Sequence, residues 1–114
     1  MESLESRLAR LEFYIQLLLE STALNSQPFY ELVVKKELTK QEFDDIFEIC
    51  EELSKKYDKQ KAEGLLDYTP LLIQFVGMLT PKIAPDEAVD ALSKQGLYKG
   101  LMREFSEIIK RIRD

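Results

Sequence analysis

The apolar residues at the start of the chain recur at intervals of four and three positions: Leu4, Leu8, Leu11, Ile15 and Leu18. This spacing is the a/d pattern of a coiled coil, and it predicts a helix over about 4–24 with one continuous apolar stripe. Phe13, Leu17 and Leu19 lie off that stripe, so one contact surface does not cover the helix. A helix that is apolar nearly all round has to be covered on nearly all sides. We therefore expect it to be central in the fold or to meet a partner chain.

Helical periodicity continues through the rest of the chain, and no window alternates for long enough to predict a strand. The apolar positions and the prolines and glycines that interrupt them predict further helices over 29–36, 40–63, 70–79, 86–95 and 97–112. The pattern indicates an all-α fold, with five to six helices in a single domain over 1–114.

Local end signals support these helices. Thr39 followed by Glu42 is a capping box, which predicts the start of the third helix. Gly64 and Gly96 stand where C-cap glycines belong. The fourth helix carries a broad apolar face, which predicts an interior position; its apolar residues are Leu71, Leu72, Phe75, Val76, Met78 and Leu79.

The composition and net charge of the chain argue against several classes of function. The chain has 114 residues and a formal net charge of −5, which argues against nucleic-acid binding and against attraction to an anionic membrane surface. The acidic N-terminus does not resemble a signal peptide, and no apolar run approaches the roughly 20 residues of a membrane span. We expect a cytoplasmic protein that binds neither nucleic acid nor membrane.

The chain contains no histidine. The usual general base, the commonest metal ligand and the ordinary near-neutral pH switch are therefore missing. Glycine-rich phosphate-binding loops are also absent. We predict that the protein is not an enzyme and carries no cofactor.

Three groups of residues could nevertheless carry chemistry. The acidic run Glu42–Glu52 could offer carboxylates such as Asp44 and Glu48 to a divalent cation, or it could be a solvated helix face. Cys50 lies on the apolar stripe of the third helix, which favours a buried, inert thiol over a reactive one. The basic C-terminal end could touch an acidic partner, or it could complement the helix dipole; its residues are Lys110, Arg111 and Arg113.

The first helix is the strongest candidate for an interaction site. Its stripe could pack only against the same chain, or it could meet copies of itself across a symmetry axis. We predict the second arrangement, with an oligomer interface formed by Leu4, Leu8, Leu11, Phe13, Ile15, Leu17, Leu18 and Leu19.

Six segments in the same order along the chain resemble the YhaI-like family of small Bacillus proteins of unknown function. They are LEFYIQLL at 11–18, PFY at 28–30, ICEEL at 49–53, QKAEG at 60–64, QGLY at 95–98 and LM at 101–102. The resemblance implies an all-helical fold in an intertwined homo-oligomer of the trimer class. It implies no activity and no catalytic residues.

Two functional hypotheses follow. The first is a non-catalytic structural, regulatory or protein-interaction module that acts as a homo-oligomer and could bind another protein. The second is a regulator that binds a small molecule or a divalent metal in a pocket between helices.

Overall fold

The structure, a computed structural model, describes the backbone of residues 2–22 and 27–113 and the side chains of 2–19 and 27–113. These residues form helices and no strand. The helices are α1 (Leu4–Thr22), α2 (Pro28–Lys35), α3 (Lys40–Ala62), α4 (Thr69–Met78), α5 (Pro85–Lys94) and α6 (Lys99–Arg113). The all-α prediction is therefore confirmed, and each predicted helix agrees with an observed one to within two residues at its described ends.

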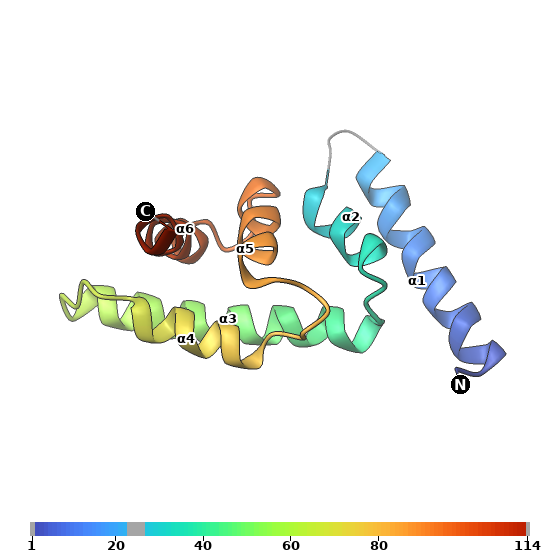
Figure 1. The fold of residues 1–114 in the computed structure, drawn as a ribbon, viewed down its shortest axis with the longest axis horizontal. Helices are drawn as coiled ribbons and strands as arrows, with labels where there is room; N and C mark the ends of the chain where they lie inside the picture. Colours follow the sequence, from blue (N-terminus) through green and yellow to red (C-terminus); the bar gives the residue numbers. More distant parts are fainter. Residues whose placement is uncertain (1, 23–26, 114) are drawn as a thin grey trace.

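The 23-residue helix α3 is the longest element, and the others are arranged around it (Figure 1). α4 folds back along α3, and α6 packs on both of these helices. α5 lies between α6 and α2, and α2 in turn carries α1 at one end of the molecule. The first helix is thus peripheral, so the expectation of a central position for it is wrong.

The hydrophobic core is one cluster that runs through all six helices. Its largest fully buried side chains include Phe29, Phe75 and Phe105, and no charged residue among those described is buried. α3 and α6 approach closely at Gly100, where a Cβ would lie 3.1 Å from Cε2 of Tyr57. A side chain there would force the tyrosine ring to move.

Several helices begin or end where the capping residues in the sequence predict. Thr39 Oγ1 accepts a hydrogen bond from the Glu42 N–H (3.1 Å), and the Glu42 carboxylate accepts one from the Thr39 N–H (2.9 Å), which completes the predicted capping box. Gly64 and Gly96 both have positive φ and close the predicted C-caps. Glu37 takes the same left-handed conformation at the end of α2, although it is not a glycine.

The first backbone N–H groups of α2 find their hydrogen-bond acceptor on a residue that lies far away in the sequence. The side-chain oxygen of Gln95, just after α5, accepts hydrogen bonds from the N–H groups of Phe29 (2.8 Å) and Tyr30 (3.3 Å). These two groups would otherwise lack a partner, because the first N–H groups of a helix have none within it. These two hydrogen bonds join α2 to α5, two helices that lie far apart along the chain.

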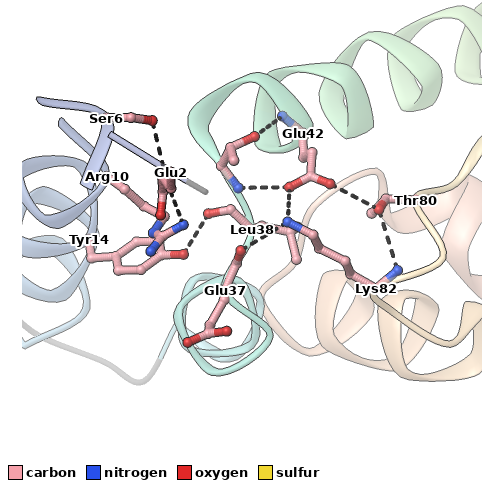
Figure 2. A network of polar contacts seen from close by, with 10 residues as sticks. Glu2, Ser6, Arg10, Tyr14, Glu37, Leu38, Glu42, Thr80 and Lys82 are labelled. Atoms are coloured by element: carbon pink, nitrogen blue, oxygen red, sulfur yellow. Dashed lines mark hydrogen bonds and ion pairs between the residues drawn. The ribbon is translucent and has the colours of Figure 1, made fainter. Parts of the chain in front are cut away.

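A polar network surrounds the start of α3 (Figure 2). Besides its capping role, Glu42 accepts hydrogen bonds from Lys82 Nζ (2.7 Å) and Thr80 Oγ1 (3.2 Å), which belong to the loop between α4 and α5. Burial of the Glu42 carboxyl acts to raise its pKa, but these hydrogen bonds and the one from the Thr39 backbone outweigh burial, so the pKa lies below its ordinary value. The network therefore favours the ionised carboxylate.

We predict that Glu42→Gln lowers the free energy of unfolding by about 1–2 kcal/mol, because it removes a charge-assisted cap and an ion pair. Since the folded pKa is lowered, this stability is present above the ordinary glutamate pKa of about 4.3 and is lost as the pH falls through the folded value. Denaturant unfolding at several pH values would measure both effects.

The exposed Glu48 on the same helix provides the matched control. Glu48→Gln should change stability by less than about 0.5 kcal/mol. A gap between wild type and Glu42→Gln that persists unchanged at pH 3 would contradict the assignment.

Candidate functional site

α1 has two different apolar faces, and one of them packs against its own chain. Phe13, Tyr14 and Leu17 are buried, at 6%, 9% and 5% exposure. The Phe13 ring lies 5.1 Å from the ring of Phe43 on α3, edge to face. The Tyr14 hydroxyl donates a hydrogen bond to the backbone carbonyl of Leu38 at 2.7 Å (Figure 2). This inward face fixes α1 to α2 and to the start of α3.

The other apolar face is largely exposed, although Leu19 at its edge also lines a cavity beside Phe13 and Phe43. Its side chains keep between 42% and 69% of their surface exposed: Leu4, Leu8, Leu11, Ile15, Leu18 and Leu19. We call these six residues the outward stripe. At about 100° per residue, its centre lies roughly 140° around the helix axis from the centre of the inward face. The two faces are therefore nearly opposite.

Charged residues border the outward stripe on its two sides. Arg7 flanks one edge, and Glu5 and Glu12 flank the other; all three are exposed. The second arginine of the helix, Arg10, is directed elsewhere, because it forms an ion pair with Glu2 at 2.8 Å. The stripe thus has a basic edge and an acidic edge.

Six of the eight residues predicted for an oligomer interface form the outward stripe. The other two, Phe13 and Leu17, lie on the inward face and are covered by the chain's own aromatic residues and helices. Tyr14, which anchors α1 between them, lies outside the set of predicted interface residues. The sequence indicates this second face through the 3-1-3 spacing of four residues, which is typical of one side of a helix: Arg10, Phe13, Tyr14 and Leu17. The interface itself stays a prediction.

α4 also exposes apolar side chains. Ile73, Val76 and Met78 are 66%, 46% and 45% exposed. The predicted interior position is therefore correct for Leu71, Leu72, Phe75 and Leu79, and wrong for Val76 and Met78. This helix packs on α3 and α6 and leaves these apolar side chains uncovered by the chain.

The acidic face of α3 is partly neutralised by residues of the same helix. Lys40 Nζ lies 3.0 Å from Asp44 Oδ2, and Gln41 Nε2 donates to Asp45 Oδ1 at 2.7 Å. Glu48 is exposed. Within residues 2–19 and 27–113, no three side chains of metal-binding type come together in a group that could hold an ion.

Cys50 is fully buried in the core, as the sequence predicts. Burial, with a smaller contribution from the neighbouring Glu51 carboxylate, raises the pKa of the Cys50 thiol to about 12. The thiolate, which is the nucleophilic form of cysteine, is therefore scarce near neutral pH.

At the C-terminal end, Arg113 pairs with Asp86 at the start of α5. None of the helices formed by the described residues is long and apolar enough to span a membrane.

The family model for proteins of unknown function DUF1878 matches residues 1–110, which is nearly the whole chain. The chain therefore belongs to this family. Because the family description assigns no activity, the function has to be argued from the geometry of the chain.

We predict that Cys50 reacts with an aromatic disulfide reagent at least about 100-fold more slowly in the native protein at pH 8 than in the unfolded chain, because the buried thiol is both protonated and shielded. Absorbance of the released thiol measures both rates. The same protein in guanidinium chloride is the control. Rapid modification of the native protein would show that α3 opens readily around this position.

Proposed function

We propose that this DUF1878 protein is a non-catalytic protein-interaction or structural module that acts in the cytoplasm as a homo-oligomer. The outward stripe of α1 is the surface through which copies of the chain meet. The observation that carries this proposal is the contrast between the two apolar faces of α1, of which the chain covers one and leaves the other in water.

The size of the exposed surface supports self-association. Fully burying a leucine or isoleucine is worth about 1.5–3 kcal/mol. Since the six side chains are 42–69% exposed, covering them would contribute roughly 5–10 kcal/mol per chain. This is comparable with the whole stability of a small domain, roughly 5–15 kcal/mol, and apolar patches of this kind on soluble proteins mark interaction sites.

The resemblance to the YhaI-like family supports the same proposal and also implies how many copies of the chain assemble. It implies an intertwined oligomer of the trimer class. The peripheral position of α1 suits such an assembly, because the six side chains of its outward stripe stay exposed from Leu4 to Leu19.

The chemistry of the chain supports a non-catalytic role. The sequence has no histidine to act as a general base, and its one thiol is buried with a raised pKa. A partner of another kind could bind the assembled oligomer, for example at the exposed apolar side chains of α4.

The central prediction concerns the double variant Leu11→Asp with Ile15→Asp. Both side chains are more than half exposed in the single chain, so their replacement should leave the helices intact and should remove the driving force for association. We expect light scattering to show an oligomer for the wild type and a monomer for the variant, with unchanged far-UV circular dichroism.

Ile73→Asp on α4 is the matched control, because Ile73 is also exposed but lies outside the stripe. It should leave the mass unchanged. A wild-type protein that is monomeric at micromolar concentration, or a double variant that keeps its mass, would refute the proposal.

A second candidate function is binding of a small molecule between helices. A cavity of about 430 Å³ opens between α1, α2 and α3 and is lined by Phe13, Gln16, Leu17, Leu19, Tyr30, Lys40 and Phe43. Its volume lies within the usual range of ligand sites, about 300–1,000 Å³, and it combines aromatic rings with a few polar groups. Asp44 and Glu48 remain the candidates for binding a divalent metal.

Thermal unfolding with a metabolite panel and with divalent cations tests this candidate, since a ligand that binds only the native state must raise the melting temperature. We expect any small-molecule shift to disappear in Gln16→Trp, which fills the cavity, and any metal shift to disappear in Asp44→Asn. The absence of any shift would leave self-association as the function.

A further inference from the structure

We propose that the outward stripes of neighbouring copies pair in parallel and in register, so that Arg7 of each copy lies against Glu12 of the next. This inference rests on the proposed function, because it specifies how the same surface meets its partner. It is carried by the heptad positions of the exposed residues together with the charges on the two edges of the stripe.

The heptad assignment follows from the 4-3-4-3 spacing. Leu4, Leu11 and Leu18 occupy d positions, and Leu8 and Ile15 occupy a positions. The structure leaves these five side chains exposed, together with Leu19 at an e position. The face that an a/d seam needs is therefore the face that the chain leaves open.

The edge charges then select the orientation of the helices. In a parallel coiled coil, a g residue faces the e residue that comes five positions later on the neighbouring helix. Arg7 is at g, and the residue five positions later is Glu12. A parallel, in-register pair therefore sets the Arg7 guanidinium group against the Glu12 carboxylate, and this ion pair recurs between each two neighbouring copies.

An antiparallel arrangement produces the opposite result. It sets e against e and g against g. In the registers that keep a residues opposite d residues, Glu12 then faces Glu5, another Glu12 or Leu19, or Glu5 faces Glu5. Arg7 never faces a glutamate in these registers. Arg10 does not relieve the repulsion between carboxylates, because it points to its own Glu2 at 2.8 Å.

The fold leaves room for parallel copies. The inward face of α1 lies roughly 140° from the stripe, so the body of each chain extends away from a shared axis along the α1 helices. Copies related by rotation about this axis form a closed assembly. Every other surface, including the exposed side chains of α4, then recurs at the same height around the axis.

Disulfide trapping tests the orientation directly. Leu18→Cys places a thiol at a d position near one end of the stripe, where it meets its own copy only in a parallel, in-register pair. We expect mild oxidation to give covalent dimers of Leu18→Cys. The wild type, whose Cys50 is buried, should give none under the same conditions. An equal mixture of Leu8→Cys and Leu18→Cys should give no dimers that join the two variants.

Charge reversal is an independent measurement that does not depend on a cysteine. Arg7→Glu and Glu12→Arg should each weaken association about tenfold, equivalent to about 1.4 kcal/mol. The double variant Arg7→Glu with Glu12→Arg should return to within about threefold of the wild type. Sedimentation equilibrium would measure these constants.

The two levels of the proposal fail in different ways. An oligomer that traps Leu8→Cys with Leu18→Cys, but not Leu18→Cys with itself, would overturn the parallel arrangement and leave self-association intact. Charge variants that weaken association without mutual rescue would also overturn it. A wild type that is monomeric would overturn both the arrangement and the proposed function.

Discussion

A chain of aromatic contacts along the first half of α3 holds the two N-terminal helices to the rest of the protein. The Phe43 ring lies 4.9 Å from Phe47, 5.1 Å from Phe13 of α1 and 6.0 Å from Phe29 of α2. Such pairs stabilise by about 0.5–1.5 kcal/mol each beyond the apolar area that they bury. Because the inward face of α1 meets this cluster, packs on α2 and donates a hydrogen bond to the Leu38 carbonyl, these contacts together determine which face of α1 is left outside.

The orientation of α1 gives this protein its most distinctive surface. Once Phe13, Tyr14 and Leu17 are turned inward, the heptad leucines stay 42–69% exposed. A solitary domain would gain by making those positions polar, since exposed apolar patches invite association. We propose that the outward stripe is half of an interface and that the charges on its edges give that interface a direction.

The helices of this protein could be predicted from the sequence more completely than the contacts between them, and particular residues show why. The Thr39–Glu42 capping box and the glycine C-caps at Gly64 and Gly96 are local signals, so they could be recognised without knowing the fold. The hydrogen bonds from Phe29 and Tyr30 to Gln95 could not, because those residues lie about 65 positions apart along the chain. The predicted burial of Val76 and Met78 is wrong for a related reason, because apolar composition alone does not distinguish a fully buried helix from one with exposed apolar side chains.

By itself, the sequence determined six helices, the ends of most of them, the burial of Cys50 and the presence of a heptad stripe on the first helix. All of these depend on residues within a few turns of one another, where helical geometry relates sequence spacing to spatial position. Only the tertiary structure decided that α1 is peripheral and that Phe13 and Leu17 belong to the chain's own core while the heptad stripe faces outward. That choice depends on which groups from distant parts of the sequence lie beside α1, above all the Phe43 ring and the Leu38 backbone carbonyl, and periodicity carries no information about them.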